Sequence, residues 1–246
     1  MLSFTPLVAR LGLLLTLLLA MGTTLIASPA FAESQSDCVA GTYFDGVDTC
    51  VPAPAGSYVD TAGAASATLS PAGSFVAASG ATEATLCVAG TYQPDTGATV
   101  CLTAPAGSFA AEGATAATDC VVGKFQATAG QTSCTNSPAG SFVSSVGAAA
   151  ATLCAAGTYQ PEAGATSCIS VAAGSFSAAG ASSATACAAG TFQSQTGQSS
   201  CTQAPAGSFV AGTGKTVSVL CAAGTYQPAA GQASCVNAPA GSFVAS

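Results

Sequence analysis

Histidine and tryptophan are absent from this sequence of 246 residues, and lysine and arginine together number three. Without histidine, serine or cysteine nucleophiles lack their usual base, so triad chemistry is excluded. So few cations cannot hold a phosphate backbone or an anionic bilayer by charge, and we expect no nucleic-acid partner. The ten acidic residues are scattered singly, which is typical of a solubilising role. We therefore expect neither catalysis nor a cofactor.

Large apolar side chains are also scarce once the first 32 residues are set aside. The remainder contains no methionine and little leucine or isoleucine, whereas alanine, glycine, serine and threonine dominate. Small side chains bury little area each, so they cannot build one ordinary globular core. The overall hydrophobic fraction of 50% is raised by the alanines and the N-terminal leader.

Residues 1–32 have the layout of a secretory signal peptide. Arg10 precedes a long apolar stretch, and a small-x-small site ends at Ala32. We predict cleavage between Ala32 and Glu33. An uncleaved anchor is the alternative, because residues 11–27 approach membrane-spanning length, but Pro29 and the Ala-x-Ala site favour processing. No later stretch is apolar enough to span a bilayer, so we expect no membrane insertion beyond the leader.

All twelve cysteines lie in the part that would be exported. An even number of cysteines in an exported chain indicates disulfides. A zinc site would need closely spaced cysteines or histidine, and the nearest two cysteines are twelve residues apart, so we expect no metal. We predict that neighbours in sequence pair with each other: Cys38 with Cys50, Cys87 with Cys101, Cys120 with Cys134, Cys154 with Cys168, Cys187 with Cys201, and Cys221 with Cys235.

Residues 33–246 form a tandem array of half-units, each about 17 residues long. Every half-unit opens with a glycine that is followed two residues later by Tyr or Phe, and a second glycine follows the first after five to seven residues. Such regularity is the signature of repeat architecture. The opening glycines are Gly41, Gly56, Gly73, Gly90, Gly107, Gly123, Gly140, Gly157, Gly174, Gly190, Gly207, Gly224 and Gly241.

Cysteine pairs recur in alternate half-units, so the full period is 33 or 34 residues. The regularity fails once, within residues 51–86, where two cysteine-free half-units follow each other and Ser70 stands where a cysteine is expected. We interpret this as an inserted half-unit or a lost cysteine. The last half-unit opens at Gly241 and is truncated, from which we expect the chain to be a fragment or a shortened reading frame.

The half-units are predicted to be hairpins. Frequent glycine and β-branched residues and the lack of an apolar stripe argue against a helical solenoid. In Pro94–Gly97, proline and glycine suit a tight turn. A disulfide holds two Cα atoms about 5.5 Å apart, whereas fourteen extended residues span roughly 46 Å. The chain must therefore fold back between paired cysteines, and the rings of adjacent half-units are expected to pack together and cover the disulfides, rather than form an exposed ladder for ligands.

These residues resemble the cysteine-rich repeats of ephrin-receptor-like and tumour-necrosis-factor-receptor-like ectodomains. Cys87-Val88-Ala89-Gly90-Thr91-Tyr92 through Cys101, followed by Pro-Ala-Gly-Ser-Phe, is similar to the one-disulfide loop of that family. Half of the family's cysteines are missing, and Ala104 stands at one of those positions. The resemblance implies a spacer or a binding rod and carries no ligand-contact motif onto this chain.

Three short motifs in the sequence are weaker indications of a binding site. Asp45 and Asp48 form the one close acidic pair, which is interpreted as a solvated turn in preference to a weak calcium site. Residues 212–216, Gly-Thr-Gly-Lys-Thr, match only the end of a phosphate-binding loop. Rows of threonine such as Thr115 and Thr118 suggest ice or surface binding, but the strict Thr-x-Thr repeat is lacking.

The sequence as a whole predicts small disulfide-rich β repeats in an elongated tandem array of short hairpin-like modules. Regular secondary structure should be sparse, apart from a hydrophobic helix in the leader. The favoured function is a secreted or cell-surface structural or adhesion protein that acts as a spacer or presenting rod. The alternative is a receptor-ectodomain-like module whose partner is an extracellular protein or glycan.

Overall fold

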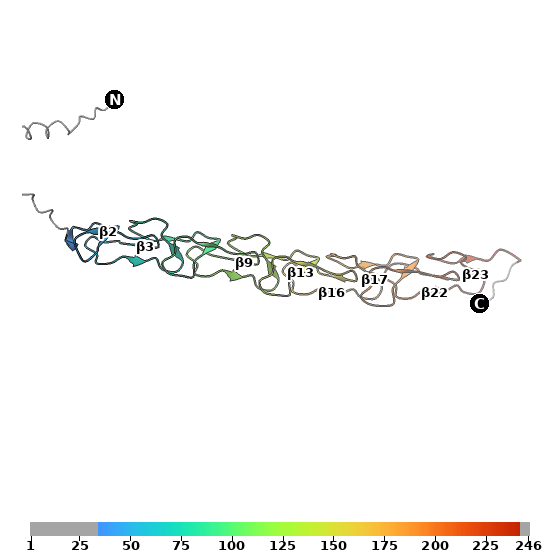
Figure 1. Cartoon of the computed structure of the whole chain (residues 1–246). Coiled ribbons are helices and arrows are strands. Elements are labelled where there is room, and N and C mark those ends of the chain that lie inside the picture. Colours follow the sequence, from blue (N-terminus) through green and yellow to red (C-terminus); the bar gives the residue numbers. More distant parts are fainter. Residues whose placement is uncertain (1–33, 242–246) are drawn as a thin grey trace, which may run out of the picture.

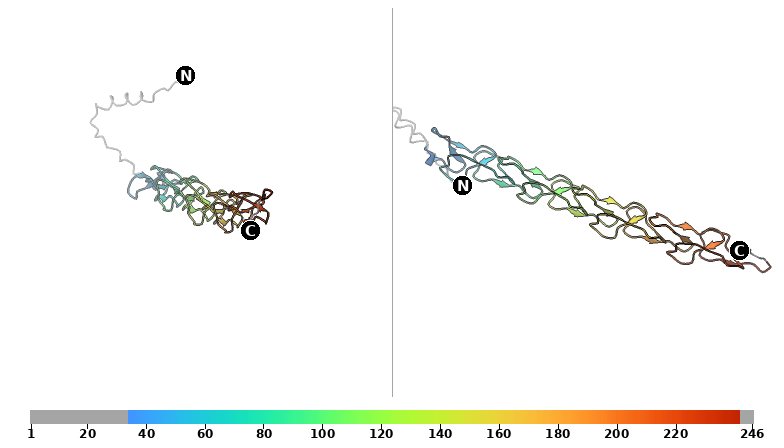
Figure 2. Two further views of the ribbon diagram at one scale, coloured as in Figure 1. Left: turned by 90° about the vertical axis from the view of Figure 1, so that its right-hand side faces the viewer. Right: turned by 90° about the horizontal axis from the view of Figure 1, so that it is seen from below.

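The computed structural model describes residues 34–241. The predicted leader, the cleavage site at Ala32 and Glu33, and residues 242–246 lie outside this range. The described chain forms one long, narrow rod, compact when seen toward its end (Figures 1 and 2). The expected fold class is confirmed, since the rod consists of short antiparallel hairpins joined by disulfides. The helix of the described part is a single 3-10 turn, η1 (Gln35–Asp37).

Twelve two-stranded sheets follow one another along the described chain, and each is a hairpin of consecutive strands. Their bounds are β1 (Thr42–Phe44) with β2 (Cys50–Pro52), β3 (Ser57–Tyr58) with β4 (Thr68–Leu69), β5 (Ser74–Phe75) with β6 (Thr85–Leu86), β7 (Thr91–Tyr92) with β8 (Leu102–Thr103), β9 (Ser108–Phe109) with β10 (Thr118–Asp119), β11 (Lys124–Phe125) with β12 (Thr135–Asn136), β13 (Ser141–Phe142) with β14 (Thr152–Leu153), β15 (Thr158–Tyr159) with β16 (Ile169–Ser170), β17 (Ser175–Phe176) with β18 (Thr185–Ala186), β19 (Thr191–Phe192) with β20 (Thr202–Gln203), β21 (Ser208–Phe209) with β22 (Val219–Leu220), and β23 (Thr225–Tyr226) with β24 (Val236–Asn237).

The junction between two hairpins is a tight turn built on the opening glycine. At Pro71-Ala72-Gly73-Ser74, the Ser74 N–H donates to the Pro71 carbonyl over 3.1 Å, and Gly73 has φ 83°. This bond and the positive φ at the third residue are those of a type II turn. The Ser74 hydroxyl donates to the same carbonyl over 2.7 Å. The recurring Pro-Ala-Gly-Ser segment therefore encodes the reversal between hairpins.

Each hairpin is bonded through its backbone to the next hairpin and to the one after it. The Gly56 N–H donates to the Val76 carbonyl, one hairpin further on, over 2.8 Å. The Gly97 N–H donates to the Ser70 carbonyl, two hairpins back, over 2.8 Å. Equivalent bonds recur along the rod, for example from Gly140 to Gln160. The rod is therefore one continuous backbone ladder rather than a string of separate beads.

The opening glycines from Gly41 to Gly190 lie against the backbone of the hairpin two positions on. A Cβ added at Gly56 would overlap the carbonyl oxygen of Gly97, closer than the 3.0 Å that real Cβ atoms respect. The same overlap would arise between Gly107 and Gly147. Because only glycine lets the two backbones approach this closely, the opening glycine is required by packing as well as by its positive φ.

Hairpins three apart along the chain return to the same side of the rod. In Figure 1, β17 and β23 lie along its upper side, whereas β16 and β22 lie along its lower side. The chain therefore winds around the rod axis as a three-sided spiral. Backbone bonds to the next two hairpins join each side to both of its neighbours.

The buried interior is a thin line of small side chains. The residue that closes each hairpin, directly after its second strand, is fully buried from the first hairpin to the one that ends at Ala204, as in Ser70, Cys87 and Val171, each 0% exposed. We expected the aromatic rings to pack on adjacent half-units and to cover the disulfides. The rings between Tyr43 and Tyr226 are instead half-buried, because the interior of so narrow a rod has no room for them.

At the N-terminal end, η1 closes the rod. The Gln35 side-chain amide donates to the Gly63 carbonyl over 2.9 Å. In later hairpins the equivalent carbonyl, such as that of Gly97, lies against an opening glycine. The turn therefore occupies the place that an earlier hairpin would fill, and acts as a polar cap.

We predict that Gly56→Ala destabilises the rod far more than Gly46→Ala. Both glycines have φ 87°, so both variants incur the left-handed backbone cost of about 1–2 kcal/mol. Only at Gly56 does the new methyl group meet a backbone carbonyl, whereas nothing lies within 4 Å of the position at Gly46. The total loss at Gly56 should reach on the order of 3 kcal/mol or more.

Thermal unfolding followed by circular dichroism measures this difference, and hydrogen exchange locates it. Faster exchange should centre on the hairpins that hold Gly56 and Gly97. Equal losses in the two variants would mean that backbone approach does not govern the stability of the rod.

Candidate functional site

Each disulfide in the described part joins neighbouring cysteines in sequence. Five of the six link two successive hairpins: Cys87 closes the hairpin β5–β6, and its partner Cys101 directly precedes β8 of the next hairpin, with 5.7 Å between their Cα atoms. We had placed both cysteines of a pair within one half-unit, but the bond crosses the junction between two. The bonds are Cys38–Cys50, Cys87–Cys101, Cys120–Cys134, Cys154–Cys168, Cys187–Cys201 and Cys221–Cys235.

The closing position holds either a cysteine or a small residue. Ser70, Ala104 and Ser137 occupy it with the same complete burial as Cys87. The serines add a bond of their own, since the Ser70 hydroxyl donates to the Ala98 carbonyl, two hairpins on, over 3.3 Å. Ser137 does the same toward Ala165 over 3.4 Å. A hairpin that lacks a closing cysteine therefore keeps the same packing. Its serine makes a hydrogen bond in place of the disulfide, and its alanine makes van der Waals contact alone.

Glutamine braces the loops of the hairpins that carry a cysteine before their second strand. The Gln160 amide nitrogen donates to the Ser167 carbonyl over 2.7 Å, and its oxygen accepts from the Glu162 N–H over 3.0 Å. Gln93, Gln126, Gln193 and Gln227 each make the corresponding bond seven residues on. These glutamines were not predicted as structural residues, although the aromatic-Gln pair recurs in the sequence.

Asp45 organises the loop of the first hairpin. Its carboxylate accepts from the Thr49 hydroxyl over 2.7 Å and from the Val47 N–H over 2.8 Å, and the N–H groups of Asp48 and Thr49 also donate to it. These bonds, led by the one from Thr49, lower the pKa of Asp45 from 3.8 to about 2. A carboxylate already occupied by four donors within its own loop is that of a structural turn, as we had favoured over calcium binding.

The other candidate motifs do not form a binding site in the described part of the chain. Residues 212–216 form part of the loop between β21 and β22, with no helix following them, so the helix N-terminus that a phosphate-binding loop requires is missing there. Within residues 34–241, no group of three His, Cys, Asp or Glu side chains is placed to hold a metal ion. Thr115 and Thr118 are both exposed, in the loop before β10 and in β10 itself.

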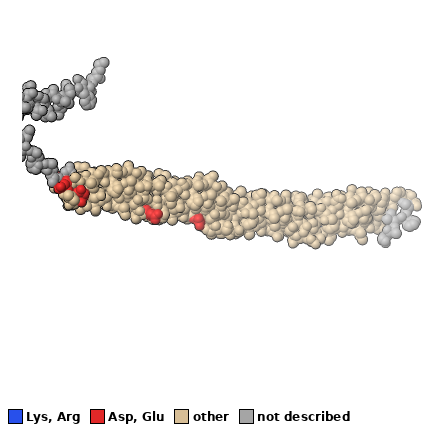
Figure 3. Space-filling model, in the orientation of Figure 1, with Lys and Arg blue, Asp and Glu red and all other residues tan. Residues whose placement is uncertain are grey.

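The surface of the rod is poor in charge. All ten acidic residues lie between Glu33 and Glu162, and the remaining third of the chain has a single charged side chain, Lys215. Figure 3 shows acidic side chains only toward the N-terminal end of the face in view. Large apolar side chains such as Leu153 and Leu220 are instead exposed, at 66% and 79%. No helix among the described residues is long and apolar enough to cross a bilayer.

We predict that Ser70→Cys with Ala84→Cys forms a further disulfide. Ser70 closes the hairpin β3–β4, and Ala84 directly precedes β6, so the two positions correspond to Cys87 and Cys101. Closing a loop of about 15 residues should stabilise the rod by roughly 3 kcal/mol. Intact mass under oxidising conditions and the rise in the unfolding temperature measure the result. The single variant Ser70→Cys is the control, and two free thiols in the double variant would contradict the equivalence of the positions.

We predict that the loop of Asp45 opens in acid. Because the pKa of Asp45 is lowered in the folded loop, its stabilising effect is complete above pH 3.8 and is lost as the pH falls through about 2. The protection of the Val47 amide from hydrogen exchange, relative to the intrinsic rate at each pH, should therefore fall across this interval. Asp45→Asn should exchange at a rate that no longer depends on this titration. An unchanged acid dependence in that variant would assign the effect to another group.

Comparison with known proteins finds a family match for one segment of the chain. Residues 107–154 match the family model described as tyrosine-protein kinase ephrin type A/B receptor-like. No curated protein matches the chain. The matched segment comprises β9–β14 together with the disulfide Cys120–Cys134, and hairpins of the same construction extend on both sides of it. Over residues 107–154 the resemblance is therefore confirmed, and the chain carries an ephrin-receptor-like cysteine-rich repeat.

Proposed function

We propose that this protein is a secreted or cell-surface structural protein that acts as a stiff spacer or presenting rod. The continuous backbone ladder supports this role most directly. Each hairpin bonds to the next two, as Gly56 does to Val76 and Gly97 to Ser70, so bending the rod at any point must break several bonds. Five disulfides cross the junctions between successive hairpins, and they add to the resistance of the rod to bending.

Export is supported by three observations. The leader has the layout of a signal peptide, which we propose is removed between Ala32 and Glu33. Six disulfides with no free cysteine in the described residues suit an oxidising compartment. The ephrin-receptor-like repeat is typical of extracellular modules. Catalysis forms no part of this proposal, because the chain lacks histidine.

A second candidate function is that of a receptor-ectodomain-like module that binds an extracellular protein or glycan. Half-buried aromatic rings, at least one in each hairpin, favour it, since each leaves part of its surface to solvent. The spacer and the binding module are compatible, because a rod that presents equivalent hairpins along its length also presents equivalent surfaces.

Expression of the whole chain in a secreting host tests the proposed function. We expect the protein in the medium, with Glu33 as its first residue and no free thiol. Small-angle X-ray scattering should give the profile of a thin rod, and a reducing agent should convert it to that of a flexible chain, because the thin interior stabilises little without its disulfides.

Deletion of one complete period provides the matched control. Removing residues 141–174 joins equivalent turns and should shorten the scattering rod without unfolding it, because neighbouring hairpins make the same contacts throughout. Retention of the oxidised chain inside the cell, or a compact scattering profile, would overturn the spacer proposal.

A further inference from the structure

Every hairpin from β3–β4 onward pairs its aromatic ring with one exposed position on the second strand, and in the first hairpin the residue opposite Tyr43 is the half-buried Val51. Phe125 lies opposite Thr135 in the pair β11–β12, and Tyr159 lies opposite Ile169 in β15–β16. The rings are half-buried, and the opposite residues from β4 to β24 are exposed. Directly opposed side chains on antiparallel strands are neighbours. Each hairpin therefore presents a compact surface made of a ring edge and one other side chain.

Ten of these twelve pairs carry a single hydroxyl group. Where the ring is tyrosine, its partner is aliphatic, and where the ring is phenylalanine, its partner is threonine. The tyrosine pairs are Tyr43–Val51, Tyr92–Leu102, Tyr159–Ile169 and Tyr226–Val236. The phenylalanine pairs are Phe75–Thr85, Phe109–Thr118, Phe125–Thr135, Phe142–Thr152, Phe176–Thr185 and Phe192–Thr202. The two exceptions are Tyr58–Thr68 and Phe209–Val219.

Folding of the hairpin does not explain why the hydroxyl is on the ring in some pairs and on the opposite residue in others. Valine, isoleucine and threonine are all β-branched and suit a strand equally well, so the strand requires no hydroxyl. Within the described residues, the hydroxyls of Thr85 and Thr135 have no hydrogen-bond partner. Thr91, on a first strand, instead donates to the Val88 carbonyl over 2.7 Å. These exposed hydroxyls are therefore available to bond to a ligand outside the rod.

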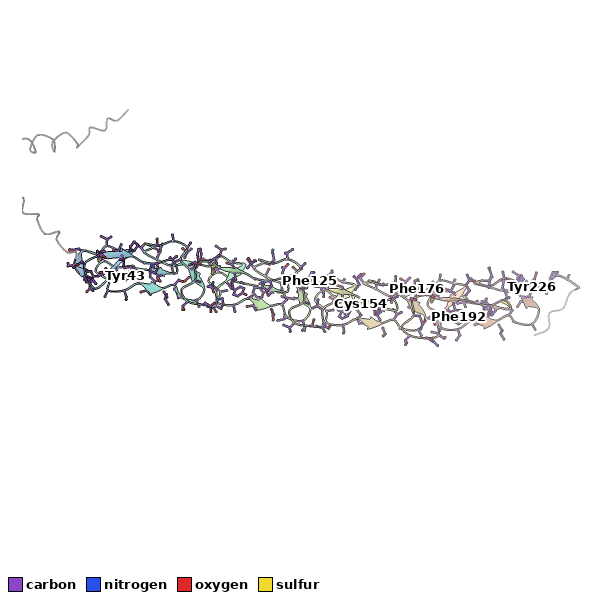
Figure 4. The ribbon with its side chains drawn as sticks, viewed as in Figure 1. Tyr43, Phe125, Cys154, Phe176, Phe192 and Tyr226 are labelled. Atoms are coloured by element: carbon purple, nitrogen blue, oxygen red, sulfur yellow. A yellow bond between two sulfur atoms is a disulfide. The ribbon has the colours of Figure 1, made fainter. Side chains whose placement is uncertain are left out.

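Two sides of the rod repeat the ring-hydroxyl pair at four successive levels. One carries β1–β2, β7–β8, β13–β14 and β19–β20, with threonine at two levels, and the other has threonine at three. The hairpins β5–β6, β11–β12, β17–β18 and β23–β24 are three apart along the chain and thus share a side. Figure 4 shows three of their rings, Phe125, Phe176 and Tyr226, along the upper edge of the rod, whereas Phe192 lies toward the lower edge. We call this side, with the pairs Phe75–Thr85, Phe125–Thr135, Phe176–Thr185 and Tyr226–Val236, the ring-hydroxyl side.

We propose that the ring-hydroxyl side binds an uncharged polysaccharide, an inference that rests on the proposed extracellular role. A ring beside a hydroxyl matches a sugar, which offers a C–H face for stacking and hydroxyls for hydrogen bonding. The scarcity of charge selects a neutral polymer, because an anionic glycan would need cations that the surface lacks. A periodic ligand also engages several weak pairs at once, which raises the overall affinity without any deep pocket.

Sedimentation with insoluble neutral polysaccharides tests the proposal, with cellulose, chitin and β-1,3-glucan as probes and the oxidised full-length rod as binder. We expect at least one of them to retain the rod, and 1 M NaCl to leave the binding unchanged. The triple variant Thr85→Val, Thr135→Val and Thr185→Val removes three hydroxyls with little change in shape. Its apparent affinity should fall roughly tenfold or more.

Two further variants make the test specific. Adding Phe75→Tyr, Phe125→Tyr and Phe176→Tyr to the triple variant moves each hydroxyl onto the ring and should restore affinity to within about threefold, as the natural tyrosine pairs imply. Thr82→Val with Thr132→Val alters exposed threonines in the loops of the same hairpins, outside the opposed strand pairs, and should leave binding unchanged.

Circular dichroism and the unfolding temperature confirm that each variant keeps the rod. Retention by none of the three polysaccharides, loss of retention in salt, or equal binding by the triple variant would each overturn the proposal. Such a result would leave the spacer role standing, because export, oxidation and the scattering profile do not depend on the threonines.

Discussion

Close contact between an opening glycine and the backbone two hairpins further on is the constraint on which the rest of the rod depends. At Gly56, the space that a Cβ would need is occupied by the Gly97 carbonyl. This approach allows each hairpin to bond to the next two through N–H and carbonyl groups. Stability is consequently distributed along the array through contacts of each hairpin with the next two, rather than concentrated in one core.

The disulfides stabilise the rod together with the backbone contacts. A thin interior of Ala, Ser, Val and Cys buries little apolar area, so it contributes little hydrophobic free energy. Cross-links such as Cys87–Cys101 restrict the unfolded chain and bridge the junction between hairpins. Where the cysteine is missing, Ser70 preserves the packing and adds a hydrogen bond. The closing position therefore tolerates chemical variation as long as the residue stays small.

A rod of this kind separates its structural positions from its surface positions within each hairpin. Glycines, closing residues and the bracing glutamines such as Gln160 are committed to the ladder, the interior and the loops. The residues opposite the rings are exposed and free to vary without disturbing the fold. Their variation between Thr135 and Ile169 follows the identity of the ring, so it carries chemical information that the scaffold itself does not require.

The sequence by itself determined the hairpin repeat, because turn residues, positive-φ glycines and the reach of a disulfide are local properties of short segments. It did not reveal that Cys87 and Cys101 lie in different hairpins, that the rings are only half-buried, or that Gln160 braces its loop. Those features depend on how hairpins wind around one axis and approach through their backbones. Only the tertiary structure decides them, since contacts between residues some 20 to 40 positions apart leave no local signal.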